Sequence, residues 1–331
     1  MQPKERYAAL DIARFIAALI VFAGHMVFLP KEIYWTSNAL VLLSPISTGA
    51  IAVLFFFVLS GFVLSFQNSK SNYADWTKRR LIRLYPVYLI SWLSGLFLVI
   101  AHDTNLLSIQ TLVLGVLGLQ SFSHESSMVV NAPLWSLSIE IIFAFFLYYL
   151  IKLRDRPIYL ILIIVFDLLI LKELSSSVIF DALPYFAIGI LLRYEKILKI
   201  RIRRFFVNSI LIIATLYYFL IGARQIKILP NTFIGDICII LGMFLFLFLL
   251  SRLHINPNLS KIAIALGKRS FCLYAFHYPI LLVFDYFLDP STNGQFALYC
   301  VLSITSTCIA TELGYRLIDI PSTAAAQRRN T

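Results

Sequence analysis

The most constraining feature of this sequence is a series of apolar runs that covers most of its length. A run of about 20 apolar residues can cross the hydrocarbon core of a bilayer as a helix, and a helix satisfies all its backbone groups internally. The pattern predicts an all-α fold, a polytopic membrane helix bundle, with one transmembrane domain over residues 1–331 and no soluble domain. The eleven runs lie at about 11–29, 45–66, 84–101, 107–121, 134–152, 157–172, 178–194, 206–223, 232–252, 270–288 and 296–318.

Composition agrees with this class of protein. Hydrophobic residues make up 60% of the chain and charged residues only 14%, whereas about a quarter of residues are charged in a soluble domain. The net charge is +11, but most Lys and Arg lie in short loops, where a cytoplasmic excess of positive charge explains them. We therefore expect no nucleic-acid partner. Cys238, Cys272, Cys300 and Cys308 lie inside apolar runs without CxxC spacing, so we expect buried thiols and no metal site.

The fourth run, 107–121, decides the predicted topology. It is short, contains Gly115 and Gly118, and precedes a polar loop. If it crosses the membrane, more Lys and Arg fall outside than inside; if it does not, the great majority fall inside. We therefore predict about ten transmembrane helices in the cell (inner or plasma) membrane, with both termini cytoplasmic. Residues 102–133 then form an extracytoplasmic loop with a re-entrant or interfacial helix near 107–121.

The first run carries Arg14 and His25 among apolar residues. An ionisable side chain inside a span is costly unless it faces the protein interior or a wet cavity. The two residues are eleven positions apart, which places them within roughly 20° of one helix face and about 16 Å apart along the axis. Arg14 then lies near the cytoplasm, where it could also snorkel to headgroups. His25 lies in the outer half, as a general base or as a partner in a helix–helix hydrogen bond.

Glu140 is the carboxylate that we expect near His25. The fifth run opens with Trp135, typical of an interfacial helix start, and Glu140 follows about two turns deeper on the outer side. This depth matches that of His25, so a carboxylate–histidine pair is geometrically possible. A structural hydrogen bond to Ser136 or Ser138 is the alternative.

Two further groups of polar residues have a structural and a functional interpretation. Arg80 and Arg83 share one helix face at i and i+3, which suits phosphate binding by guanidinium groups; a solvated, topology-setting charge patch is the alternative. His277 precedes Pro279, and a kinked helix with a polar residue suggests a cavity wall. Alternatively, His277 fills the hydrogen bond lost at the proline.

Small and charged residues of other runs are interpreted first as packing elements. Ser60 and Gly61 form a small-residue notch between helices, and Gly189 permits close packing. Glu312 and Arg316 form an i,i+4 pair. Ser60 is also a candidate for the wall of a substrate cavity.

In their order along the chain, six motifs resemble the acyltransferase 3 family of integral-membrane O-acyltransferases. The family includes O-antigen and exopolysaccharide O-acetyltransferases and Nod-factor acetylases. The resemblance runs nearly end to end, although Phe271 stands where the family usually has Tyr. The motifs are LDIARFIAALIVFAGH, FFFVLSGF, RRLIRLYP, LWSLSIE, YFAIG and LGKRSFCLYAFHYPI.

The resemblance implies acyl transfer from acyl-CoA, with acetyl-CoA favoured, to a hydroxyl of an extracytoplasmic glycan or a lipid-linked saccharide. It implies His25 as general base or acyl relay, with Glu140 as its partner. It also implies that CoA phosphates bind to Arg14, Arg80 and Arg83. We expect the substrate or cavity residues to be His277, Trp135 and Ser60, and no metal to take part.

Two other functions remain open on the sequence. One is a transporter or flippase of a sugar, a lipid-linked intermediate or an acyl group. Inverted repeats and broken helices in matching halves would indicate it, and none is visible. A structural scaffold would not need a buried histidine and a carboxylate at matched depth. Membrane O-acyltransferase is therefore the function that the sequence favours.

Overall fold

The structure, a computed structural model, describes residues 8–29, 49–67, 72–102, 104–171, 178–194, 233–253 and 255–328. Every regular element within these ranges is a helix, as the sequence predicted. The long and medium helices are α1 (Ala8–Phe28), α3 (Gly49–Ser65), α4 (Tyr73–His102), α5 (Ile109–Val116), α6 (His124–Val129), α7 (Trp135–Lys152), α8 (Pro157–Phe166), α10 (Val178–Leu191), α13 (Phe233–Leu250), α14 (Pro257–Leu288), α15 (Asn293–Gly314) and α16 (Ile320–Gln327). Short 3₁₀ or π segments are η2 (Thr104–Leu106), η3 (Gln120–Phe122), η4 (Ala132–Leu134), η5 (Asp167–Leu171) and η6 (Tyr315–Asp319).

Five helical stretches in the described ranges are long and apolar enough to cross a membrane. They include α1, α4, α7, α14 and the α15–α16 stretch, and four shorter apolar helices of 10–17 residues accompany them. These findings fit a multi-pass membrane protein. The predicted run at 206–223 lies outside the described residues, so the count of about ten spans and the cytoplasmic position of the termini stay predictions.

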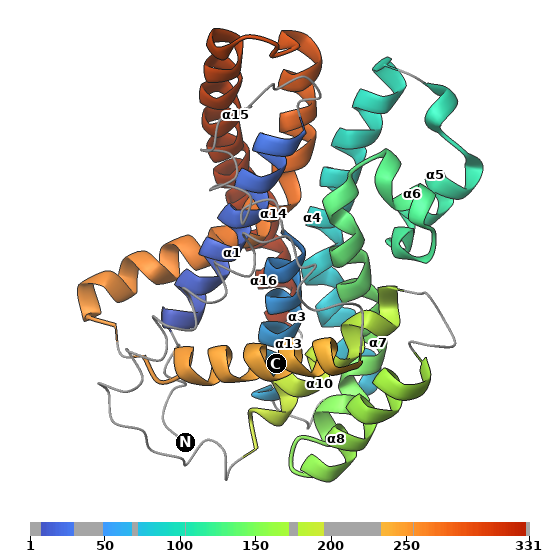
Figure 1. Cartoon of the computed structure of the whole chain (residues 1–331), viewed down its shortest axis with the longest axis vertical. Coiled ribbons are helices and arrows are strands. Elements are labelled where there is room, and N and C mark those ends of the chain that lie inside the picture. Colours follow the sequence, from blue (N-terminus) through green and yellow to red (C-terminus); the bar gives the residue numbers. More distant parts are fainter. Residues whose placement is uncertain are drawn as a thin grey trace.

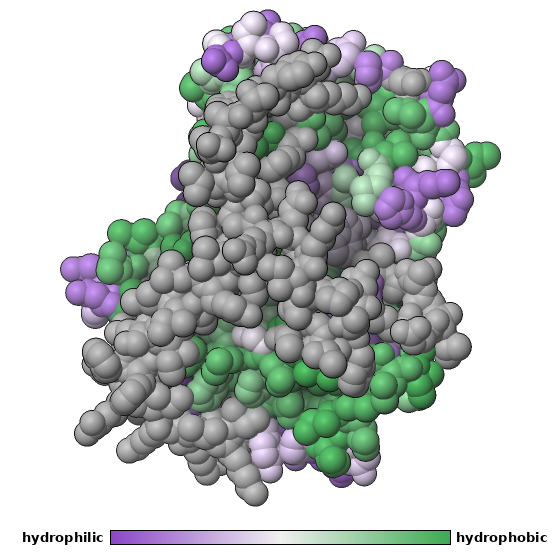
Figure 2. All heavy atoms as spheres, viewed as in Figure 1, coloured by the Kyte–Doolittle hydropathy of each residue, from purple (hydrophilic) through white to green (hydrophobic). Residues whose placement is uncertain are grey.

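Helix α14 is the central element of the bundle. It packs along α1, runs beside α15 and also contacts α4 (Figure 1). Helix α4 in turn contacts α7 and α16, while α3 packs against α10 and α1. Large apolar side chains such as Phe97, Ile161 and Val301 are exposed, and hydrophobic side chains form broad areas over the lower part of the described surface (Figure 2). Apolar surface of this extent is what a lipid environment accommodates.

Close contact between α3 and α10 depends on glycine. A Cβ atom on Gly61 would overlap the backbone carbonyl oxygen of Phe186, and one on Gly189 would overlap that of Val58. Small residues let two helix backbones approach closely in a membrane protein. The predicted packing roles of Gly61 and Gly189 are therefore confirmed, and this contact holds Ser60 in a defined position.

The segment around 107–121 does not form a full span. Helix α5 has 8 residues, about 12 Å of rise, which is too short to cross a bilayer. It packs sideways on α4, where the Tyr88 hydroxyl donates to the Gly115 carbonyl at 2.9 Å. The prediction of a re-entrant or interfacial helix at this place agrees with the short, laterally packed α5.

The chain then returns into the middle of the bundle before α7 begins. Asn131 is fully buried, and its amide nitrogen donates to the Ser91 hydroxyl at 2.9 Å and to the Ala275 carbonyl at 3.4 Å. Ser91 and Ala275 lie near the middle of α4 and α14. Helix α7 therefore begins level with the middle of α4 and α14. The predicted interfacial start at Trp135 stays a prediction.

The same contacts repair the helix bond that Pro279 cannot make. A proline lacks the N–H that would donate to the carbonyl four residues earlier, here that of Ala275. The Ser91 hydroxyl donates to this carbonyl at 2.5 Å, and Asn131 adds a second donor. His277 does not fill this role, so that alternative is wrong and the imidazole is available for another one.

The predicted pair of Glu312 and Arg316 is present, and Arg269 joins it as a third member. Arg316 Nε lies 2.5 Å from Glu312, and Arg269 Nε lies 2.6 Å from the same carboxylate. This network joins α14 to the end of α15.

Candidate active site

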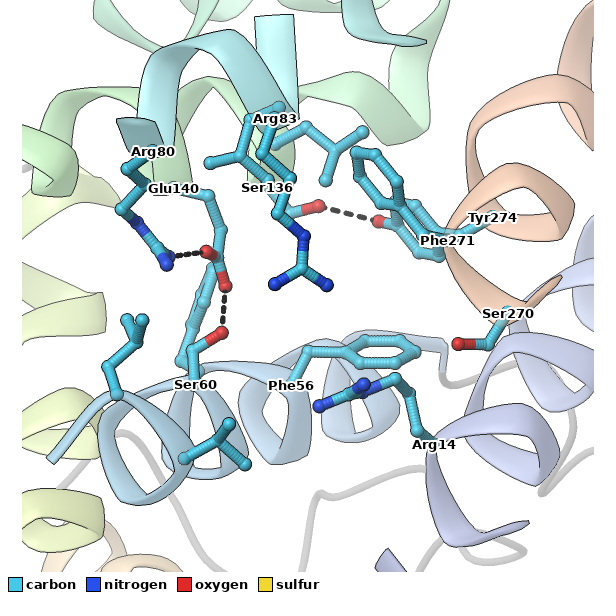
Figure 3. A pocket seen from close by; sticks show the side chains of 15 residues that line it. Arg14, Phe56, Ser60, Arg80, Arg83, Ser136, Glu140, Ser270, Phe271 and Tyr274 are labelled. Atoms are coloured by element: carbon cyan, nitrogen blue, oxygen red, sulfur yellow. Dashed lines mark hydrogen bonds and ion pairs between the residues drawn. The ribbon is translucent and has the colours of Figure 1, made fainter. Parts of the chain in front are cut away.

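A small cavity of about 120 Å³ lies where α1, α3, α4, α7 and α14 meet. The guanidinium groups of Arg14 and Arg83 point toward its space (Figure 3). Arg80, Ser60 and Glu140 also line it. The three arginines that the sequence proposed as one phosphate-binding group are thus brought together, although they come from two helices far apart in the chain.

Glu140 is bonded within this cavity to Arg80 and Ser60. The Arg80 guanidinium and the Ser60 hydroxyl both donate to the Glu140 carboxylate (Figure 3). The Glu140 side chain is only 11% exposed and that of Arg80 only 10%. A buried charge of this kind requires a partner, and the ion pair provides it.

This arrangement corrects the expected pairing of Glu140 with His25, and it also replaces the alternative bonds to Ser136 or Ser138. Because α7 begins level with the middle of α4 and α14, Glu140 lines one cavity with Arg14 and Arg80, and His25 does not line it. The sequence analysis had instead matched the level of Glu140 to that of His25.

A large cavity of about 980 Å³ adjoins the small one. The two share the side chains of Arg14, Arg83 and Phe271, and the large cavity adds Lys268. It is formed by the beginning of α1, the end of α3 and α16, which the predicted topology places on the cytoplasmic side. Two carboxylates, Asp11 and Asp319, line the large cavity together with these three cations, so the cations exceed the carboxylates by one.

His25 forms a second polar site with His277. Nδ1 of His25 lies 3.1 Å from Nε2 of His277, and the ring centroids are 5.2 Å apart. His277 is fully buried, whereas His25 is partly exposed. The pair is formed by α1 and α14, the helices with extensive mutual contact.

Hydrogen bonding assigns the protons of the two neutral rings. His277 Nδ1 lies 2.7 Å from the Tyr274 carbonyl oxygen, which can only accept, so Nδ1 carries the proton. Nε2 of His277 is then an acceptor, and the protonated Nδ1 of His25 donates a hydrogen bond to it. This leaves Nε2 of His25 with a lone pair, the state that a general base needs.

Tyr274 connects the two sites. It lines the small cavity, its carbonyl orients His277, and its hydroxyl lies 2.7 Å from that of Ser136 (Figure 3). Its ring makes edge contacts with Phe56 at 5.5 Å between centroids. Sequence reasoning missed Tyr274, Ser136 and Phe56 as site residues because an aromatic or a serine in an apolar run carries no distinguishing signal.

Trp135 occupies a packing position. Its ring meets Phe57 edge-on at 6.3 Å between centroids, and it is not among the residues lining the two cavities. Its predicted role at the substrate stays a prediction. Among the described residues, no group of three His, Cys, Asp or Glu side chains could hold a metal ion.

Comparison with known proteins gives the family. The model of the acyltransferase 3 family, described as an acyltransferase domain, matches residues 7–312. The chain is 34% identical to acyltransferase MdmB of Streptomyces mycarofaciens over 150 residues, which are 43% of this chain and 38% of that protein. The alignment thus spans well under half of the curated relative. No solved structure matches the chain. Because the family model covers most of the sequence, the protein belongs to the acyltransferase 3 family, and its long apolar helices fit a multi-pass membrane protein.

Proposed function

We propose that the protein transfers a small acyl group, acetyl in first place, from acyl-CoA to a hydroxyl of an extracytoplasmic or lipid-linked glycan. The donor enters from the cytoplasmic side. The observation that carries this proposal is the position of a cationic cavity directly beside a neutral histidine pair, with Tyr274 in contact with both.

The cationic cavities suit the phosphates of CoA. Arg14, Arg83 and Lys268 line the large cavity, where they outnumber the two carboxylates of Asp11 and Asp319. Guanidinium groups bind phosphate through paired hydrogen bonds. Arg80 carries a buried Nε with no hydrogen-bond partner among the described residues, a donor that an anionic ligand would satisfy. The narrow inner end, lined by Phe56, suits the pantetheine arm and a small acyl group.

The histidine pair suits proton removal from the acceptor. In this proposal Nε2 of His25 takes the proton of the acceptor hydroxyl, and His277 holds the ring in the required tautomer. Both rings are neutral before the reaction, so the pair sits in an apolar bundle without a buried charge. Glu140 then acts on the donor side, where it positions Arg80.

The acceptor is tested by mass spectrometry of surface glycans. We expect a strain that lacks the gene to lose an acyl mass increment, and the wild-type gene to restore it. A strain carrying His25→Ala at wild-type protein level should resemble the deletion. Unchanged acylation in the deletion strain would contradict a glycan acceptor, and full acylation with His25→Ala would contradict the assigned base.

The donor is tested separately with purified protein in lipid nanodiscs. We expect acetyl-CoA to bind and Arg14→Gln to weaken its binding. The matched control is Arg156→Gln, because Arg156 is an exposed arginine of the loop between α7 and α8. Equal affinity for wild type and Arg14→Gln would contradict the assigned donor cavity.

A further inference from the structure

Tyr274 lies at the boundary between the small cavity and the histidine pair. It is 4% exposed, and it sits one helical turn below His277, whose ring centroid is 5.9 Å from its own. Neither His25 nor His277 lines the small cavity. Tyr274 lines the cavity and contacts His277, so it lies between a donor held by the arginines and the histidine pair.

The hydroxyl of Tyr274 belongs to a hydrogen-bonded triangle that has more acceptors than protons. It donates to the Pro133 carbonyl at 2.9 Å, the Ser136 hydroxyl donates to the same carbonyl at 3.2 Å, and the two hydroxyls lie 2.7 Å apart. Each hydroxyl has one proton. If Tyr274 turns its proton elsewhere, Ser136 can still donate to the Pro133 carbonyl, and the two hydroxyl oxygens, which then have no proton between them, move apart from 2.7 Å.

We propose that the Tyr274 hydroxyl donates a hydrogen bond to the carbonyl oxygen of the bound thioester and stabilises the negative charge that develops there. This inference rests on the proposed function. A phenol in a water-poor site is a suitable donor because little solvent competes with it. Ser136 is a positioning residue that keeps the Pro133 carbonyl satisfied while Tyr274 engages the substrate.

In this proposal the acyl group moves from sulfur to oxygen through a tetrahedral intermediate. The acceptor oxygen attacks the thioester carbon, its proton passes to Nε2 of His25, and the carbonyl electron pair moves to oxygen, where Tyr274 donates. The tetrahedral intermediate then re-forms the carbonyl and breaks the carbon–sulfur bond. The CoA thiolate leaves and takes the proton from His25, so the products are an ester and CoA.

The test is the substitution Tyr274→Phe, which keeps the ring and removes the hydroxyl. Purified wild type and variant are compared with acetyl-CoA as donor and membranes of the deletion strain as acceptor. Removing one such donor lowers kcat by about a hundredfold or more. We expect this loss in kcat with little change in KM for acetyl-CoA. Ser136→Ala should lower kcat by less than Tyr274→Phe.

The matched control is Tyr286→Phe, because Tyr286 is an exposed tyrosine of the same helix, 57% accessible, and should leave kcat unchanged. A kcat within twofold of wild type for Tyr274→Phe would overturn the proposal. So would a loss explained wholly by a lower amount of folded protein, measured by its thermal melting. If wild-type protein transfers no acyl group from acetyl-CoA, the proposed function itself fails, which is a different result.

Discussion

The small cavity and the histidine pair are neighbouring polar sites in one apolar bundle, but they hold different kinds of group. In the cavity the buried groups are charged, and Arg80 is matched by Glu140. In the histidine pair the groups are neutral, and each proton has an acceptor. A paired charge offers a field for binding an anion, whereas a neutral ring with a lone pair is ready to move a proton. The proposed sites of donor binding and of proton transfer therefore lie about one helical turn apart.

Among substitutions at these two sites, the largest effect is expected from His25→Ala. General-base catalysis contributes about 10²–10⁴-fold to a rate, so we expect kcat to fall by that factor with little change in KM for acetyl-CoA. His277→Ala removes only the acceptor for Nδ1 of His25 and should cost less. An increase in KM with unchanged kcat for His25→Ala would place this residue at the donor instead.

A second test breaks the ion pair of the cavity. Removing one partner of a buried pair costs about 3–5 kcal/mol, so Arg80→Gln and Glu140→Gln should each lower the free energy of unfolding markedly. Their effects should not add in the double variant, because both remove the same interaction. Thermal melting in nanodiscs measures this cycle. Additive effects would contradict a direct pair and revive a role for Glu140 at His25.

A third test concerns Arg83, whose guanidinium, like that of Arg14, points into the small cavity (Figure 3). A hydrogen bond to a charged group contributes about 1.5–3 kcal/mol, so Arg83→Gln should raise KM for acetyl-CoA by roughly ten- to a hundredfold with kcat retained. Steady-state kinetics across donor concentration measures both constants. A drop in kcat at unchanged KM would show that Arg83 acts in the chemistry rather than in donor binding.

The smallest effect is expected from the helix contact that supports the cavity. Gly189→Ala places a Cβ against the Val58 carbonyl, and overpacking costs about 1 kcal/mol or more. We expect this variant to have a lower melting temperature than wild type. Gly242→Ala is the matched control, because a Cβ there meets nothing within 4 Å, and alanine is the better helix former. Equal melting temperatures of the two variants would contradict the close packing of α3 on α10.

Much of the fold follows from residue patterns. The helical class follows from the length of the apolar runs, and the short helix α5 follows from its glycines and from the charge balance of the loops. Gly61 and Gly189, which allow the close contact between α3 and α10, were also recognised from the sequence as packing residues. The number of spans depends on helices near the minimum length and on residues outside the described ranges, so it remains a prediction.

The sequence placed Glu140 beside His25, whereas in the structure Glu140 lies beside Arg80. Arg14, Arg80, Arg83 and Glu140 meet in one cavity, as charged groups in apolar helices must find one another or water. The partner of His25 could not be derived from depth alone. Depth depends on where α7 begins, and that is set by the buried Asn131 and its long-range hydrogen bonds.

Hydrophobic runs and motifs are local properties, and they were enough to place this chain among the helical membrane proteins of the acyltransferase 3 family. The pairing of His25 with His277, the pairing of Glu140 with Arg80 and the position of Tyr274 between the two sites depend on tertiary packing. The physical reason is that a buried polar group takes whichever partner the packing brings within about 3 Å. That distance depends on how helices far apart in the sequence are stacked.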